Sequence, residues 1–137
     1  MNFAGISYIA VFFAAVAGFA FGAFYYTFLG TQWMNALGKT REDIERQRSP
    51  LPFVIAGVAQ LVIAFVLAGT IGHLGQGMVT IRNGVISALF VWVGFIATTM
   101  AVNYAFQGAR FRLTLIDGGH WLGGLLIQGL IIGWIGV

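Results

Sequence analysis

The chain has 137 residues, of which 59% are hydrophobic and only 8% are charged. Soluble domains carry about 25% charged residues, so this chain has too few charges to cover its surface in water. Its net charge of +3 comes from seven basic residues between apolar stretches, which is not the pattern of a typical nucleic-acid binder. Soluble globular and disordered chains are excluded as well, and the lipid bilayer is the predicted solvent.

Four apolar stretches are long enough to cross a bilayer, which takes about 20 helical residues each. They are residues 6–29, 51–72, 84–104 and 113–137. Backbone groups do not stay unpaired in lipid, so we expect helices. The triplet Ala15-Val16-Ala17 is similar to a signal-peptide cleavage site, but hydrophobicity continues to Leu29. The first stretch is therefore expected to span the membrane rather than to be removed.

The connections between these stretches are short, at residues 31–50, 73–83 and 107–112. Short connections place consecutive helices side by side and antiparallel. The predicted fold is all-α, a single domain over residues 1–137 that forms an up-down-up-down bundle of four transmembrane helices. Every Lys and Arg except Arg82 lies in the first or third connection. The positive-inside rule therefore places these two connections in the cytoplasm and both termini outside.

The first connection contains the signals of a short charged helix over residues 41–48. Thr40 and Asp43 have the spacing of a capping box, and Glu42 and Arg46 form an i,i+4 pair. Ser49-Pro50-Leu51-Pro52 then ends this helix and opens the second span. A solvated connector without a function is the alternative interpretation.

Glycines recur at a spacing of four in the first and last spans. The pairs are Gly18 with Gly22, Gly119 with Gly123, and Gly129 with Gly133. In lipid, such small-residue faces let helix backbones approach closely. They predict close packing, either within one chain or between the copies of a homo-oligomer.

Polar residues inside the spans indicate a candidate site. Those on the third and fourth spans fall along one face of each helix, and a tight turn joins these helices, so their polar faces are expected to meet near the inner surface. The predicted cluster contains Asn103, Gln107, Arg110, Asp117 and His120, with Gln128 and Gln60 deeper in the bundle.

Asp117 is the acidic residue that falls within an apolar span. A charge there costs roughly 2.5–3.5 kcal/mol on insertion scales, so Asp117 is expected to have a partner. Arg110 and Arg112 are the nearest candidates along the sequence. A salt bridge would make a structural clasp, whereas a polar pocket or proton-handling site is the functional alternative.

The residues do not indicate a catalytic site, a metal site or a cofactor. There is no cysteine, and the two histidines, His73 and His120, are expected at opposite sides of the membrane. The sequence contains no H-E-x-x-H, P-loop or G-x-S-x-G motif.

Two signatures are similar to those of a known family. The first is Phe24-Tyr25-Tyr26-Thr27-Phe28-Leu29-Gly30 followed by Trp33, Gly38 and Asp43-Ile44; the second is Asn103-Tyr104, Arg110, Leu115-Ile116-Asp117-Gly118-Gly119-His120, Gly129 and Trp134. They resemble the bacterial domain-of-unknown-function family 1761, small integral membrane proteins, over nearly the whole chain. The resemblance implies four transmembrane helices and a bacterial cytoplasmic membrane, and it implies no established activity. The aromatic run of the first signature suggests an interfacial girdle or, alternatively, a slot for lipid.

Three functions follow as hypotheses. The first is a non-enzymatic structural or accessory protein, acting as a homo-oligomer or with other membrane proteins, with a closed interior and Asp117 paired to arginine. The second is a small oligomeric transporter or channel with a path lined by Gln60, Asn103, Gln107, Asp117 and Gln128. The third is an enzyme acting on a lipid or quinone, with Asp117 and His120 facing an open cleft.

Overall fold

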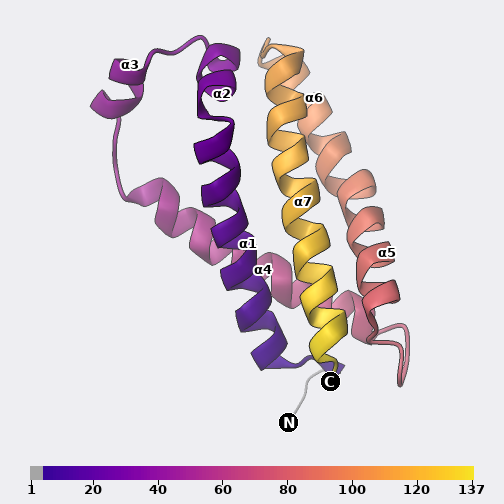
Figure 1. Cartoon of the computed structure of the whole chain (residues 1–137). Coiled ribbons are helices and arrows are strands. Elements are labelled where there is room, and N and C mark those ends of the chain that lie inside the picture. Colours follow the sequence, from indigo (N-terminus) through magenta and orange to yellow (C-terminus); the bar gives the residue numbers. More distant parts are fainter. Residues whose placement is uncertain (1–4) are drawn as a thin grey trace.

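The computed structural model describes residues 5–137, and the regular structure within them is helical (Figure 1). The elements are α1 (Tyr8–Phe28), α2 (Gly30–Leu37), α3 (Arg41–Arg46), α4 (Leu51–Gly72), α5 (Ile81–Val91), a π-helical turn (Trp92–Ala97), α6 (Thr98–Phe106) and α7 (Phe111–Ile135). Four helical stretches, with α5 to α6 counted as one, are long and apolar enough to cross a membrane. The predicted all-α fold with four spans is therefore confirmed.

The starts of several helices are fixed by capping side chains or by a proline in the first turn. The Ser7 hydroxyl accepts the Ala10 N–H at the start of α1, and the Thr80 hydroxyl accepts the Asn83 N–H at the start of α5. Pro52 lies in the first turn of α4, where its missing N–H is no loss. These local signals account for starts close to those that hydrophobicity predicted.

The first connection is shorter than predicted, because its residues 31–37 form α2. Leu29 donates its N–H to Tyr25 and accepts the N–H of Trp33, so α2 follows α1 almost without a break. The continuous run of α1 and α2 ends at Gly38, whose φ of 71° lies in the left-handed region that glycine adopts readily. The predicted charged helix is confirmed as α3, with both hydrogen bonds of the Thr40–Asp43 capping box.

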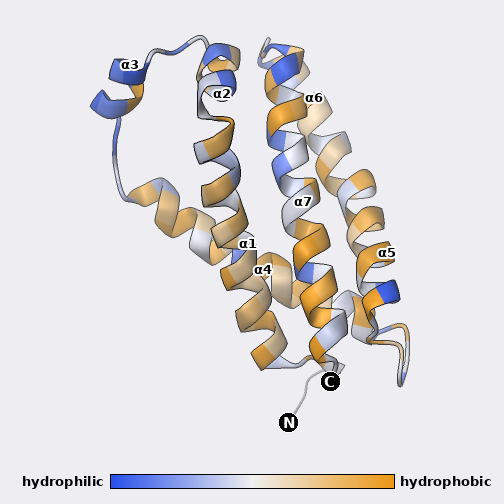
Figure 2. Cartoon of the chain, in the orientation of Figure 1, coloured by the Kyte–Doolittle hydropathy of each residue, from blue (hydrophilic) through white to orange (hydrophobic). Residues whose placement is uncertain are grey.

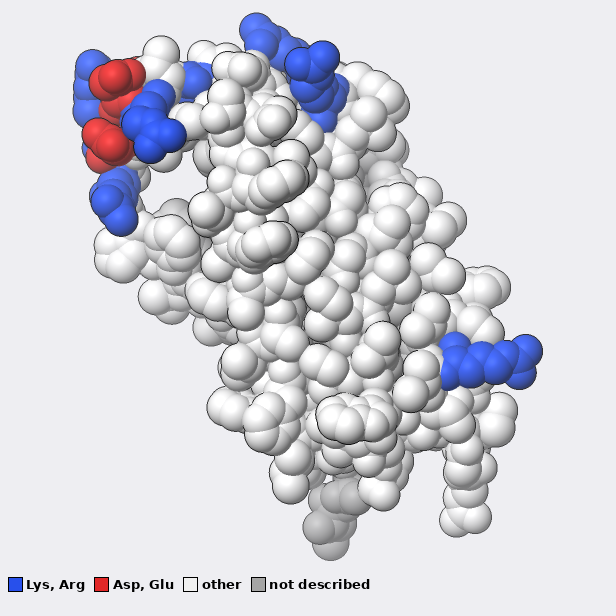
Figure 3. All heavy atoms as spheres, viewed as in Figure 1, with Lys and Arg blue, Asp and Glu red and all other residues white. Residues whose placement is uncertain are grey.

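Helix α7 lies at the centre of the bundle, between α1–α2 on one side and α5–α6 on the other (Figure 1). Helix α4 crosses behind at a steep angle, and α3 stands away from the bundle. Hydrophilic colour and most charged side chains gather at the end that carries α3 (Figures 2 and 3). We call this the charged end, and the opposite end, where residue 5 and the C-terminus lie, the termini end.

The half of the bundle near the termini end has an apolar core. Its most buried large side chains are Ile6, Leu67, Ile71, Leu125 and Ile132. Side chains of α4 and α7, together with Ile6 ahead of α1, thus fill this half of the interior. A smaller apolar cluster around Ala36, Leu113 and Ile116 lies near the charged end, where α2 meets α7.

Glycines set the close approach of α5 to α7. A Cβ at Gly84 would overlap the carbonyl of Gly129, and a Cβ at Gly133 would overlap the backbone of Thr80 and Ile81. The two helices therefore touch backbone to backbone, which maximises dispersion contacts in lipid.

Candidate functional site

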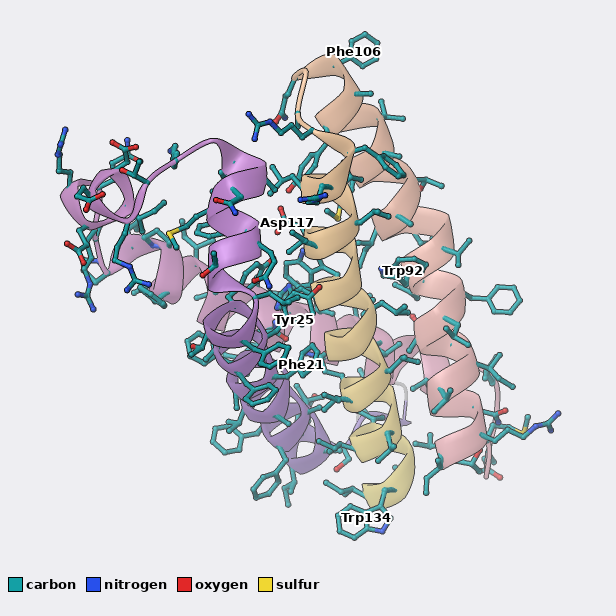
Figure 4. The ribbon with its side chains drawn as sticks, turned by 45° about the horizontal axis from the view of Figure 1, so that its top comes forward. Phe21, Tyr25, Trp92, Phe106, Asp117 and Trp134 are labelled. Atoms are coloured by element: carbon teal, nitrogen blue, oxygen red, sulfur yellow. The ribbon has the colours of Figure 1, made fainter. Side chains whose placement is uncertain are left out.

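Two tyrosines hold the carboxylate of Asp117. The Tyr26 hydroxyl on α1 donates to Oδ1 at 2.6 Å, and the Tyr104 hydroxyl on α6 donates to Oδ2 at 2.6 Å. Asp117 itself is on α7, so a single side chain joins three helices at the charged end of the bundle (Figure 4).

Two further side chains bond the backbone on either side of Asp117. The Tyr25 hydroxyl donates to the Ile116 carbonyl at 2.6 Å, and the Trp92 indole N–H donates to the Gly118 carbonyl at 2.9 Å. Three consecutive residues of α7 thus each receive a side-chain donor. Trp92 is the first residue of the π-helical turn.

The expected arginine partner of Asp117 is not what the structure shows. The Arg110 guanidinium donates to the Asn35 carbonyl near the end of α2, and Arg112 is exposed. Arg110 precedes α7, and seven residues of helix rise separate it from Asp117, about 10 Å. The tyrosines reach the carboxylate directly from facing helices, so the clasp is made of neutral donors.

Two predicted members of the polar cluster lie outside it. Asn103 and Gln107 are exposed, whereas their neighbour Tyr104 turns inward to Asp117. Polar side chains near a helix end meet headgroups and water, so their polarity does not require an inward face. The inward residue of this turn is the amphipathic tyrosine, which covers apolar surface with its ring and bonds through its hydroxyl.

His120 is enclosed by aromatic rings. Its side chain is only 7% exposed and lies within ring-centroid distances of 4.8 to 6.2 Å of four neighbours: Phe21, Tyr25, Tyr26 and Trp121. Its Nδ1 has no hydrogen-bond partner among residues 5–137. His120 follows Asp117 by three residues on α7, so both belong to one helical face.

Gln60 and Gln128 form a buried pair deeper in the bundle. The Gln128 amide donates to Gln60 Oε1 at 2.6 Å and to the Gln60 carbonyl at 3.3 Å. Their side chains are 4% and 1% exposed. Gly18 on α1 makes this pair possible, because a Cβ there would overlap Gln60 Oε1 and lie 2.9 Å from Gln128 Nε2.

The predicted glycine ridges pack within the chain. A Cβ at Gly22 would lie 2.8 Å from His120 Nε2, one at Gly119 would lie 2.8 Å from the Tyr25 hydroxyl, and one at Gly123 would overlap the Phe21 ring. Together with Gly18, Gly129 and Gly133, these glycines make room for side chains or backbone of neighbouring helices. The intramolecular interpretation of the glycine pattern is the one that the structure supports.

Sequence reasoning missed the tyrosines and Trp92. The aromatic run around Tyr25 and Tyr26 was interpreted as a girdle or slot, but only Phe24 and Phe28 of that run are strongly exposed. An available signal was the pairing of hydroxyl-bearing aromatics with an acid in a span, because a buried phenol needs an acceptor. Groups of three or more His, Asp or Glu that suit a metal ion are absent among the described residues.

The polar side chains that follow one another along α7, Asp117, His120 and Gln128 with their partners, are here called the polar seam. Together with the helices they define a small all-helical protein with four membrane-span-like helices. The family model described as "Protein of unknown function (DUF1761)" matches residues 9–133, nearly the whole chain, and the protein belongs to this family. No curated protein and no solved structure shows significant similarity to it.

Proposed function

We propose that this chain is a non-enzymatic structural or accessory protein of the bacterial cytoplasmic membrane, with α3 in the cytoplasm, and that it acts as a homo-oligomer. The observation that carries the proposal is the exposure of the first five residues of α4. Residues 51–55 are all exposed, and five consecutive helical residues cover every face of a helix. This part of α4 has no neighbour within the described chain, so a second copy is the proposed neighbour.

Small residues support a contact between copies at this place. Gly57 lies on α4 with no atom of another element within 4 Å of its Cβ position, and Ala56 precedes it. Apolar area alone does not drive helices together in lipid, but small residues allow close packing. The paired glycines of α1 and α7 are already used inside the chain, whereas Gly57 is free to meet a partner.

Charge on α3 supports a partner identical to this chain. Arg41, Glu42, Glu45 and Arg46 place both signs of charge on this short helix, as Figure 3 shows at the charged end. A two-fold contact brings the same patch of both copies together, so a patch of mixed sign is complementary to itself. Residues 47–50 connect α3 to α4, so both features lie on one side of the molecule.

The closed interior supports a role without transport or catalysis. The polar path proposed for a transporter lacks Asn103 and Gln107, which are exposed, and apolar side chains fill the bundle between Gln128 and the termini end. His120, a candidate for an enzyme, is enclosed by four aromatic rings instead of facing an open cleft.

Cysteine cross-linking in native membranes tests the proposal, because the chain contains no cysteine of its own. Ile55→Cys on α4 is expected to give cross-linked dimers on mild oxidation. Val102→Cys is the matched control, because it is a similarly exposed apolar residue on α6 near the same end. Adding Gly57→Leu to Ile55→Cys should reduce the dimer several-fold, whereas adding Ala101→Leu should not. Equal cross-linking at both cysteines, or none, contradicts the proposed interface.

A further inference from the structure

Gly124 on α7 is buried and yet has free space beside it. No atom of another element lies within 4 Å of the position that a Cβ would take there. Protein interiors are close-packed, and other buried glycines of this chain, such as Gly18 and Gly129, would bring a Cβ into overlap. The space beside Gly124 is therefore open, and we call it the chamber.

Two buried polar atoms without partners flank this glycine. His120 lies four residues before Gly124 and Gln128 four residues after it, so all three share one face of α7. His120 Nδ1 and Gln128 Oε1 are the buried side-chain atoms of residues 5–137 that lack a hydrogen bond. Both side chains are more than nine-tenths buried, at 7% and 1% exposure.

The hydrogen bonds of the glutamine pair explain why Gln128 Oε1 is left over. Gln128 Nε2 faces two acceptors, Gln60 Oε1 and the Gln60 backbone carbonyl. The carbonyl cannot donate, so turning the Gln128 amide over would set oxygen against oxygen. The amide orientation is thereby determined, and its oxygen needs a donor from elsewhere.

Glycines leave the space between the two side chains open. Long helical side chains lean toward the turn before them, so Gln128 lies over the turn that contains Gly124, and His120 lies one turn further along α7. On α1, Gly18 faces the glutamine pair and Gly22 faces His120. Glycines on both helices thus remove the side chains that would otherwise separate these polar groups. Figure 4 shows how closely α1 and α7 approach around Phe21 and Tyr25.

We propose that the chamber at Gly124 is a binding site for water, and that this water bridges His120 Nδ1 and Gln128 Oε1. A water molecule donates one O–H to the amide oxygen and either donates the other to Nδ1 or accepts the Nδ1–H, depending on the imidazole tautomer. Buried water characteristically occupies polar cavities in which it satisfies such atoms.

The bridge extends the polar seam from the charged end to the middle of the bundle. Asp117 and His120 both contact Tyr26, water joins His120 to Gln128, and Gln128 bonds Gln60. Beyond the glutamine pair the core is apolar, with Leu125 and Ile132 at 1% and 2% exposure. The polar seam is therefore hydrated but ends at the glutamine pair and does not cross the bundle. This water site does not depend on the proposed oligomer.

Selective ¹⁵N-histidine labelling tests this site, because the chain contains only two histidines. In lipid nanodiscs, magnetisation transfer from water to the ring is expected for His120 as well as for the exposed His73, which serves as the internal reference. Gly124→Ala should reduce the His120 transfer at least fivefold by occupying the chamber, while His73 stays unchanged.

Gly30→Ala is the matched control, because it adds the same methyl group at a glycine on α2 that also has free space. It should leave the His120 transfer unchanged. Absence of transfer to His120 in the wild-type protein overturns the proposal by itself, whatever the variants do. Equal transfer in the wild type and in folded Gly124→Ala overturns it too.

Discussion

The hydroxyl of Tyr26 on α1 and the carboxylate of Asp117 on α7 are 91 residues apart in sequence and 2.6 Å apart in space. Tyr104 on α6 donates to the second carboxylate oxygen. The acid thus ties the first span to the last two through neutral donors. Removing a donor, the acid or a glycine from this seam tests its role directly.

Replacing Asp117 by asparagine should destabilise the fold. The asparagine amide has one acceptor oxygen, so one tyrosine hydroxyl meets an N–H group and loses its acceptor. Leaving a buried donor without its acceptor costs roughly 1–3 kcal/mol, and we expect a loss of this order in the free energy of unfolding in detergent. Glu42→Gln on exposed α3 is the control and should have little effect.

The same Asp117→Asn variant separates a structural from a transport role. We expect no proton or solute flux in liposomes from either the wild type or the variant. Flux in the wild type that Asp117→Asn abolishes, at an unchanged yield of folded protein, would favour the transporter instead.

Removing the two tyrosine hydroxyls should show coupling. Tyr26→Phe and Tyr104→Phe are each expected to cost about 1–2 kcal/mol, since each leaves one carboxylate oxygen without its donor. The double variant should depart from additivity by at least about 0.5 kcal/mol, because both hydroxyls bond one carboxylate. Tyr8→Phe, at a half-exposed position far from Asp117, is the control. Strict additivity of the unfolding free energies would argue against a shared site.

A methyl group at Gly18 should weaken the contact of α1 with α4 and α7. It would overlap Gln60 Oε1 and push the glutamine pair apart, so Gly18→Ala is expected to destabilise by about 1–3 kcal/mol. Gly30→Ala on α2 offers the same change without a neighbour and should be neutral or stabilise by up to about 1 kcal/mol, because alanine favours helix. Thermal unfolding in one detergent compares the two. Equal effects would mean that the Gly18 contact is not tight.

The stability of α3 should depend on pH. Hydrogen bonds from the Thr40 backbone and side chain, with a smaller effect of Lys39, lower the pKa of Asp43 below its ordinary value. A lowered pKa in the folded helix means that ionised Asp43 stabilises α3 above its unfolded pKa of about 3.9, and that this is lost as the pH falls through the folded pKa. NMR chemical shifts of residues 41–46 should report less helix near pH 3 than near pH 6. Thr40→Ala should remove most of this difference.

Span positions could be predicted from the sequence because they depend on local composition. In lipid, a stretch of about 20 apolar residues must pair its backbone N–H and C=O groups with each other, which a helix does. Hydrophobicity alone therefore located all four spanning helices. The Thr40–Asp43 capping box is also local, and its prediction was confirmed. Helix α2 was missed because its polar residues stop the hydrophobic signal, although the backbone continues as a helix to Leu37.

The partners of Asp117 could not be predicted in the same way. Arg110 is close in sequence, but α7 carries it about 10 Å from the acid, while Tyr26 and Tyr104 arrive on facing helices. Asn103 and Tyr104 are adjacent and differ by about 100° around the helix, so only the crossing of α6 with α7 decides which one turns inward.

The sequence by itself determined the solvent, the number of spanning helices and the end at which basic residues gather, because these depend on composition along the chain. Tertiary structure alone decided that tyrosines hold Asp117, that the glycines of α1 and α7 pack within the chain, and that His120 and Gln128 flank a chamber at Gly124. These features depend on which helical faces pack together and how closely. The same sequence pattern of small and polar residues is compatible with several different helix packings.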